Sequence, residues 1–215
     1  MNRGWERGNA RAARTEYPRT CHVFKPNLQT IDFVKSTNRQ KIAEIGIYKG
    51  YTSERLAEHL SGQGELHLFD FRYRVTEVKA KLNAAGYHNI VIHGNSRKTY
   101  DSYTWSLMRL LQKHERPFFD YVFLDGAHTW HVDALAFFLI DRLLKVGGYI
   151  DFDDYRWSLK KSPTMNPDVF PATTRMYTQE QIRERHVKLI VDLLVKRDPR
   201  YKEVVKNKIY EKVAM

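Results

Sequence analysis

The feature that most constrains the fold is a regular alternation of strand-like and helix-length stretches between residues 41 and 152. Short runs rich in β-branched and aromatic residues read as strands at 41–46, 65–71, 89–93, 119–124 and 148–152. Stretches of helical length separate them, at 53–60, 75–85, 103–113 and 130–144. Alternating strands and helices predict an α/β fold, a mostly parallel sheet with helices on both faces. Right-handed crossovers then bring the carboxyl ends of the strands to one edge, where ligands of such folds bind.

This pattern changes after Tyr155. Residues 156–178 contain three of the seven prolines and no periodic pattern, which is typical of a lid loop. Residues 179–196 return to helical spacing, and 201–205 with 208–213 read as a C-terminal antiparallel hairpin that closes the sheet. We therefore predict a basic N-terminal arm over residues 1–40 and one domain over 41–215, with a lid loop at 156–178.

The formal net charge of +11 is concentrated at the two ends of the chain. Residues 1–40 hold eight Lys and Arg against three Asp and Glu, residues 155–215 hold fourteen against seven, and the middle is balanced. Basic ends favour an anionic small molecule or nucleic acid as partner, and a solvated basic surface explains them equally well. No apolar run is long enough to span a membrane or to form a signal peptide. The single cysteine, Cys21, excludes an internal disulfide, so we expect a cytoplasmic protein.

Two glycines and two acidic residues mark a nucleotide-binding edge. The first strand ends in Glu44-x-Gly46-x-x-x-Gly50, at a strand-to-helix turn. Glycines there let the backbone approach a ligand, and the N–H groups that open the next helix face it. Asp70 ends the second strand, where a carboxylate can accept both hydroxyls of a ribose. The spacing G-x-G-x-x-G is absent, which argues against NAD and FAD.

Carboxylates also follow the fourth and fifth strands. Asp125 ends the fourth strand, and Asp153 and Asp154 end the fifth. Carboxylates at neighbouring strand ends repel one another, and a hard divalent cation relieves that repulsion. Asp151 shares a strand face with Asp153 and competes with it for the role of ligand. His128 lies three residues beyond Asp125 and is a candidate general base, with a structural histidine as the alternative.

The first of these patterns resembles the class I S-adenosylmethionine-dependent methyltransferases. Glu44-x-Gly46-x-x-x-Gly50 is similar to the first motif of that family, and Asp70 to the acidic residue that closes its second strand. Asn95 and Ser96 stand where the family holds the adenine ring. The resemblance implies a Rossmann-like methyltransferase sheet and S-adenosylmethionine as cofactor.

Residues 40–155 further resemble a metal-dependent branch that methylates sugar hydroxyls, the macrocin and mycinamicin O-methyltransferases. The matching residues are Asp125, Gly126 and His128 after the fourth strand, and Asp153, Asp154 and Tyr155 after the fifth. The resemblance implies that Asp125, Asp153 and Asp154 bind Mg²⁺, that Asp125 also borders the cofactor, and that His128 acts as the base. Asp153 stands where that branch often has Glu, so the preferred metal stays open.

The sequence thus predicts an enzyme that methylates a hydroxyl of a small molecule or sugar with the help of a divalent metal. Two alternatives remain open. One is a metal-independent N- or carboxyl-methyltransferase, in which the aspartates bind substrate. The other is a non-catalytic protein that retains the cofactor fold and binds nucleic acid through its basic ends. The sequence leaves the acceptor and the oligomeric state undetermined.

Overall fold

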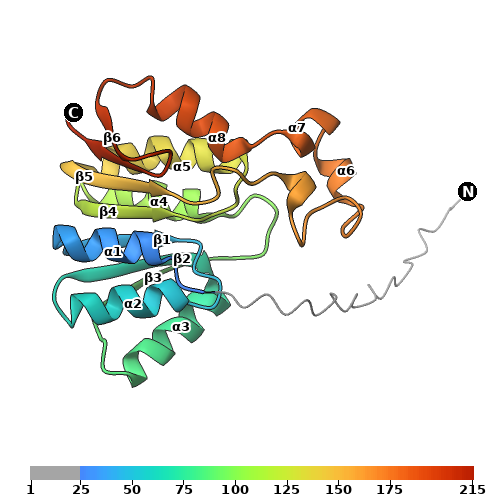
Figure 1. The fold of residues 1–215 in the computed structure, drawn as a ribbon. Helices are drawn as coiled ribbons and strands as arrows, with labels where there is room; N and C mark the ends of the chain where they lie inside the picture. Colours follow the sequence, from blue (N-terminus) through green and yellow to red (C-terminus); the bar gives the residue numbers. More distant parts are fainter. Residues whose placement is uncertain (1–24) are drawn as a thin grey trace, which may run out of the picture.

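A computed structural model describes residues 25–215, and within them it forms a seven-stranded sheet (Figure 1). The strand order is β3-β2-β1-β4-β5-β7-β6. Five neighbouring strands are parallel, and β7 runs antiparallel to both β5 and β6. The strands are β1 (Lys41–Ile45), β2 (Glu65–Phe71), β3 (Ile90–Asn95), β4 (Phe119–Leu124), β5 (Leu144–Phe152), β6 (Tyr201–Val205) and β7 (Ile209–Lys212). The predicted α/β sheet with a C-terminal antiparallel hairpin is confirmed.

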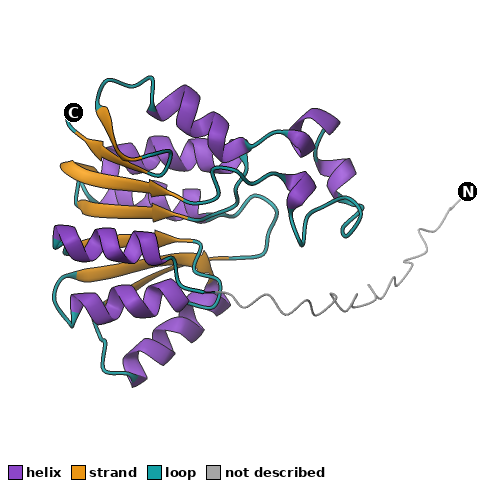
Figure 2. Ribbon diagram, viewed as in Figure 1, coloured by secondary structure: helices purple, strands orange, loops and turns teal. Residues whose placement is uncertain are grey.

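Helices cover both faces of this sheet, so the core has two halves (Figure 2). On one face lie α1 (Leu28–Thr37), α2 (Tyr51–Leu60) and α3 (Arg72–Ala84), whose buried side chains pack with Ile42, Leu66 and Tyr121. On the other lie α4 (Tyr103–Lys113), α5 (Trp130–Leu143) and α8 (His186–Ile190), followed by a single π-helical turn, η2 (Val191–Val195). The short elements η1 (Leu159–Lys161), α6 (Thr173–Met176) and α7 (Gln179–Arg183) lie beyond the carboxyl ends of the parallel strands. None of the helices in residues 25–215 is both long and apolar enough to cross a membrane.

Helix α1 lies inside the stretch that we assigned to an N-terminal arm. The Asn27 side chain accepts a hydrogen bond from the Thr30 N–H and caps the helix. Val34 is buried in the core, and the Thr30 hydroxyl donates to Asp151 on β5 over 2.6 Å. These tertiary contacts place α1 in the folded domain, which therefore begins before residue 41. Residues 1–24 of the expected arm lie outside the described residues.

The stretch 179–196, for which we predicted helical spacing, is divided in the structure into α7 and α8 with η2. Thr178 and Gln181 form a capping box that starts α7, and the chain becomes extended at Glu184 before α8 begins at His186. The His186 ring contacts two residues outside α8. Nδ1 accepts the Trp130 N–H of α5 over 3.0 Å, and Nε2 lies 2.7 Å from the Gln181 carbonyl oxygen.

Candidate active site

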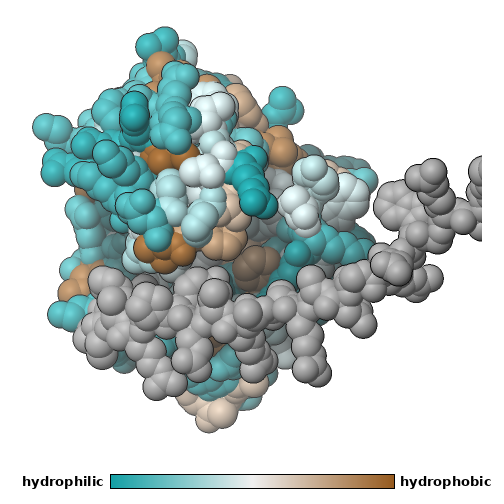
Figure 3. All heavy atoms as spheres, turned by 90° about the vertical axis from the view of Figure 1, so that its right-hand side faces the viewer, coloured by the Kyte–Doolittle hydropathy of each residue, from teal (hydrophilic) through white to brown (hydrophobic). Residues whose placement is uncertain are grey.

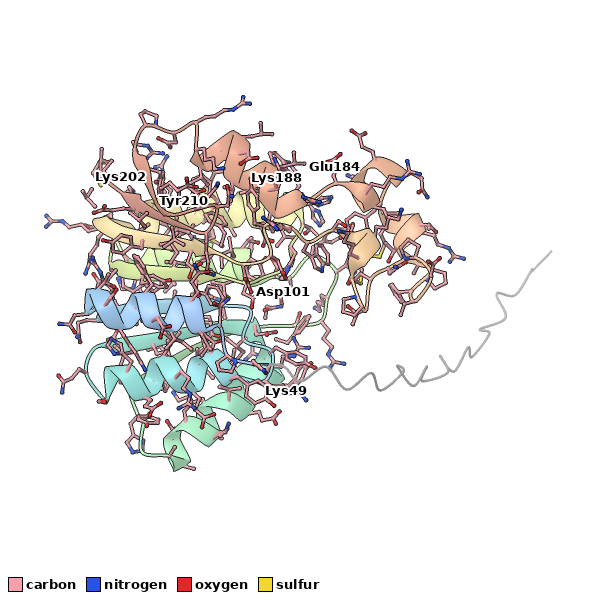
Figure 4. The ribbon with its side chains drawn as sticks, in the orientation of Figure 1. Lys49, Asp101, Glu184, Lys188, Lys202 and Tyr210 are labelled. Carbon is pink, nitrogen blue, oxygen red and sulfur yellow. The ribbon has the colours of Figure 1, made fainter. Side chains whose placement is uncertain are left out.

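The carboxyl ends of the five parallel strands lie on the right-hand side of Figure 1, together with η1, α6 and α7. Lys49, before α2, and Asp101, before α4, come to this same end of the sheet in Figure 4. Figure 3 looks at this side and shows hydrophobic and weakly polar side chains near the centre of the face, with hydrophilic ones around them. The predicted site residues therefore belong to one edge of the sheet.

The β1–α2 turn requires its two glycines. Gly46 has φ +87°, and a Cβ there would lie 1.8 Å from the carbonyl oxygen of Asp125. Gly50 has φ +75°, and its Cβ would lie 2.7 Å from the Val78 side chain. Only glycine adopts this backbone readily and permits both approaches. The turn consequently lies directly against the end of β4, which brings the two predicted halves of the site together.

The Asp70 carboxylate accepts hydrogen bonds from the backbone of this turn. Its Oδ2 accepts the N–H groups of Ile47 and Tyr48, each over 3.1 Å. Its Oδ1 accepts the Phe71 N–H over 2.6 Å and lies 3.3 Å from the Arg74 guanidinium. The carboxylate that we expected to bind a ribose is thus already engaged with the backbone of the glycine turn.

Glu44 lies buried beneath the same turn. Its Oε2 has no hydrogen-bond partner in the described part of the chain. The pKa of Glu44 is raised to about 8, mainly by burial; the Ser53 hydroxyl opposes this rise and the nearby Asp70 charge adds to it. A buried acceptor of this kind is satisfied by a cationic or hydrogen-bond-donating ligand group.

Asn95 is the last residue of β3 and Ser96 follows it, because the strand continues two residues beyond its predicted end at 93. The Asn95 amide donates to the carbonyl oxygens of Ser96 and Asp101, and the Asp101 carboxylate accepts the Ser96 N–H over 2.6 Å. These bonds fold the β3–α4 loop back on itself next to the end of β2. The loop is therefore shaped by its own side chains.

A cluster of two carboxylates and an imidazole lies where β4 and β5 end. His128 Nε2 lies 3.2 Å from Asp125 Oδ1, and Nδ1 lies 2.7 Å from Asp154 Oδ2. One ligand atom from each of the three residues lies within 4.8 Å of the others. His128 and Asp154 both have positive φ, 56° and 57°, an uncommon backbone for residues other than glycine. Two strained residues in one cluster indicate a functional constraint on its geometry.

The charges of this cluster perturb one another. Burial raises the pKa of Asp125 well above its usual range, and the carboxylates of Asp153 and Asp154 raise it further. Burial lowers the pKa of His128, but the contact with Asp154 outweighs it, so the net shift is upward. The carboxylates contribute to both upward shifts, and a proton on His128 or a cation would reduce this negative charge.

Asp151 and Asp153 contact residues outside the cluster of Asp125, His128 and Asp154. Asp151 is fully buried and accepts the hydroxyls of Thr30 and Tyr121, each over 2.6 Å. Its other oxygen lies 2.8 Å from the Lys208 ammonium, which is also 4.0 Å from Asp153. Asp151 thus joins α1, β4 and the β6–β7 turn. The structure groups His128, and not Asp153, with Asp125 and Asp154.

Sequence comparison identifies the family. The profile of a methyltransferase domain matches residues 43–155, which is more than half of the chain. The chain belongs to this methyltransferase domain family. The matched stretch runs from β1 to the residue after Asp154, so it contains the glycine turn and the whole acidic cluster. No curated protein matches the chain.

Solved methyltransferases share the fold at low sequence identity. The O-methyltransferase from Bacillus cereus, in complex with SAH, is 16% identical with a TM-score of 0.60, over 88% of this chain and 82% of that one. The SAH-bound methyltransferase PaMTH1 from Podospora anserina is 19% identical with a TM-score of 0.55, over 85% and 74%. A methyltransferase from Geobacter sulfurreducens is 11% identical with a TM-score of 0.53, over 87% and 78%. The Rossmann-like methyltransferase fold is thereby confirmed.

Sequence reasoning missed three residues that lie next to the cluster of Asp125, His128 and Asp154. The Lys208 ammonium, on the β6–β7 turn, lies 4.0 Å from the neighbouring Asp153, and nothing in its local sequence indicates this. Tyr103 and Asp133 bond beneath the loop that carries His128. Asp133 gives a usable signal, because it is an acid within the apolar stretch Val132–Ala136 of α5.

Proposed function

We propose that this methyltransferase transfers a methyl group from S-adenosylmethionine to a hydroxyl group of a small molecule or sugar, with a divalent cation held by the acidic cluster. The observation that carries the proposal is the direct contact between the Gly46 turn and Asp125, because it joins a cofactor turn to a set of metal ligands. The SAH-bound O-methyltransferase of the same fold supports the choice of cofactor and of oxygen as acceptor.

The residues present fit this cofactor. S-adenosylmethionine would supply a methyl group on a positively charged sulfur. The glycine turn leaves room for a ligand close to its backbone, and the unpartnered oxygen of Glu44 beneath it suits a cationic or N–H-bearing group. We assign the ribose to Asp70 and the adenine to Asn95 and Ser96. Asp70 would then serve both the ligand and the turn, with Arg74 as the partner that it can release.

The donor set also fits a divalent cation. Asp125 and Asp154 would hold it with Asp153 as a third carboxylate, and the cation would lower the pKa of an acceptor hydroxyl and orient it. The close grouping of His128 with Asp125 and Asp154 favours a second arrangement, in which the imidazole is the third ligand. Oxygen ligands alone suit Mg²⁺, whereas an imidazole shifts the preference towards Mn²⁺ or a later transition metal.

His128 is our candidate for the general base. It would accept the proton of the acceptor hydroxyl while that oxygen takes the methyl group. Its ring is packed edge-on against Trp157, with the centroids 5.2 Å apart, and lies between the two carboxylates. These contacts hold the ring beside Asp125, the residue whose carbonyl oxygen borders the Gly46 turn, and so support the proposed role.

Binding and chelation test the proposal. S-adenosylhomocysteine is expected to bind the purified protein with a micromolar dissociation constant in calorimetry. Asp70→Ala should weaken that binding by roughly 1–3 kcal/mol, the usual cost of losing charge-assisted hydrogen bonds. EDTA should abolish methyl transfer to a panel of hydroxylated acceptors, and Mn²⁺ or Mg²⁺ should restore it. No binding to the wild type would end the proposal, and full activity on the hydroxylated acceptors after chelation would show that the reaction needs no metal. Methyl transfer to amines or carboxylates alone would favour the metal-independent N- or carboxyl-methyltransferase.

A second variant decides the role of His128. If His128 is the base, His128→Ala should retain cofactor and Mn²⁺ affinity and lower kcat by about 10²–10⁴-fold. The base must be neutral, and the pKa of His128 is raised, so the rate should increase with pH through a value above 6.5, and this limb should be absent from the mutant. His131→Ala, on the first turn of α5, is the matched control. Loss of Mn²⁺ affinity in His128→Ala would instead make His128 a ligand.

A further inference from the structure

Beneath the loop between β4 and α5 lies a buried pair, Tyr103 and Asp133. Tyr103 is the first residue of α4 and Asp133 lies in the first turn of α5, and both are almost fully buried. The Tyr103 hydroxyl donates to Asp133 Oδ1. The pair therefore links the two helices that pack together on one face of the sheet.

The same pair binds the backbone on either side of His128. The Tyr103 hydroxyl oxygen accepts the Ala127 N–H over 2.9 Å, and Asp133 Oδ2 accepts the Thr129 N–H over 3.1 Å. His128 is thus the residue between two anchored peptide groups. Gly126 permits the arrangement, because a Cβ there would lie 2.3 Å from the Tyr103 hydroxyl.

His128 needs such support because its backbone is unfavourable. A residue with a side chain in the left-handed region costs free energy and persists where surrounding contacts determine it. The anchors on Ala127 and Thr129 fix the turn, and the turn sets the distances from His128 to Asp125 and Asp154. Without them the peptide between β4 and α5 can relax, and the ring leaves the cluster.

We propose that Tyr103 and Asp133 are positioning residues for methyl transfer, which hold His128 in the cluster through the flanking peptide N–H groups. This inference rests on the proposed function for its catalytic consequence. The anchoring of the loop by Tyr103 and Asp133 does not depend on the proposed function, because the hydrogen bonds alone support it. Neither side chain hydrogen-bonds to the cluster carboxylates within residues 25–215, so the flanking backbone carries their positioning effect. The charge of Asp133 also acts on His128 directly, whereas Tyr103→Phe leaves that charge in place.

The chain offers a matched control. Tyr201 is also buried, and its hydroxyl donates to the buried Asp141 over 2.8 Å at the other end of α5. Tyr103→Phe and Tyr201→Phe each delete one buried tyrosine–aspartate hydrogen bond. A merely structural role predicts a similar loss of Tm and similar kinetics for both variants. A positioning role predicts that they differ at the active site.

We expect Tyr103→Phe to lower kcat by about 10–100-fold with little change in KM for S-adenosylmethionine, as loss of a group that orients a catalytic side chain does. Tyr201→Phe should keep the wild-type kcat. Hydrogen exchange followed by NMR is the second measurement: the Ala127 and Thr129 amides should exchange at least about tenfold faster in Tyr103→Phe, because an acceptor is lost and the loop opens.

Asp133→Asn provides the same test if Tyr103→Phe does not fold, because it keeps the shape and removes one acceptor. Wild-type exchange rates for both amides in these variants would overturn the proposal, as would an equal fall in kcat in Tyr201→Phe. Faster exchange in a protein whose wild type shows no methyl transfer would refute the proposed function and leave the anchoring role intact. The two failures are therefore distinguishable.

Discussion

At the scale of single residues, the candidate site is a set of acidic groups that the fold keeps close together, although their burial and mutual repulsion cost free energy. Glu44, Asp125 and Asp154 lie at the ends of three strands, and the environment raises the pKa of the first two. Proteins tolerate such groups mainly where a ligand or a reaction uses them. The Lys208 ammonium offsets part of the charge near Asp151, and the remaining excess lies at the cluster of Asp125, His128 and Asp154.

Glu44 gives a prediction for the pH dependence of stability. The pKa of its carboxyl is about 8 in the folded protein against 4.5 for a free side chain, so between these values the folded state binds more protons than the unfolded state. Its stabilising contribution is fully present below pH 4.5 and is lost as the pH rises through 8. Residue 44 cannot titrate in Glu44→Gln. The difference in free energy of unfolding between Glu44→Gln and the wild type should therefore shift in favour of the mutant by about 1–3 kcal/mol from pH 5 to pH 8.5.

Urea unfolding at the two pH values measures this difference. Glu115→Gln, which changes an exposed loop carboxyl in the same way, serves as the control and should follow the wild type. If the free energies of unfolding of Glu44→Gln and the wild type fall by the same amount as the pH rises, burial does not raise the pKa of Glu44.

At the scale of elements, the segment 156–178 stands apart from the sheet and helices. Its bonds are mainly internal: the Thr173 hydroxyl donates to the Met165 carbonyl oxygen, and the Asn166 amide donates to the Lys160 carbonyl oxygen. Its first part lies on the candidate active site, since Trp157 packs against His128. A segment that is folded on itself and touches the site at one end suits the role of lid that we predicted from its prolines.

We expect this lid to close when ligand binds. Trypsin should cleave the ligand-free protein at the exposed residues Lys160, Lys161 and Arg175, and S-adenosylhomocysteine with Mn²⁺ should slow that cleavage several-fold. Cleavage at Arg197, exposed after η2, should be unaffected and is the internal control. Mass spectrometry of the fragments reads out each site. Equal slowing at all four residues would indicate general stabilisation, and no slowing would mean that the segment is not a lid.

At the scale of the whole molecule, the sheet brings together groups that are distant in the sequence. The Asp125 carbonyl meets the Gly46 turn because β1 and β4 are neighbours in parallel register, although about 80 residues separate them. Asp154 meets His128 because β5 pairs with β4. Helix α1 is fixed to the far side of the same sheet through Thr30 and Asp151, and Lys208 comes to it from the C-terminal hairpin. The cluster is thus determined by strand order.

The sequence by itself determined the sheet and the identity of the residues at its edge. Periodic apolar runs with glycine turns are local signals, so the strands 65–71 and 119–124 and the helix 103–113 were predicted to the residue. The acids and glycines of the predicted site could be placed at strand ends for the same reason. Their roles as ligands of cofactor and metal remain proposals.

The tertiary structure alone decided which side chains face one another. Helix α1 has a weak pattern of its own and depends on Thr30 and Val34 packing against the sheet. The stretch 179–196 is divided between α7 and α8, and His186 at the start of α8 accepts the Trp130 N–H of α5, a contact that no local pattern records. Likewise Asp153 shares its sequence neighbourhood with Asp154, yet His128 takes the place beside Asp125, because a left-handed turn anchored by Tyr103 and Asp133 directs its ring inward. Such positions follow from long-range contacts, whose energies appear only when the strands and helices are assembled.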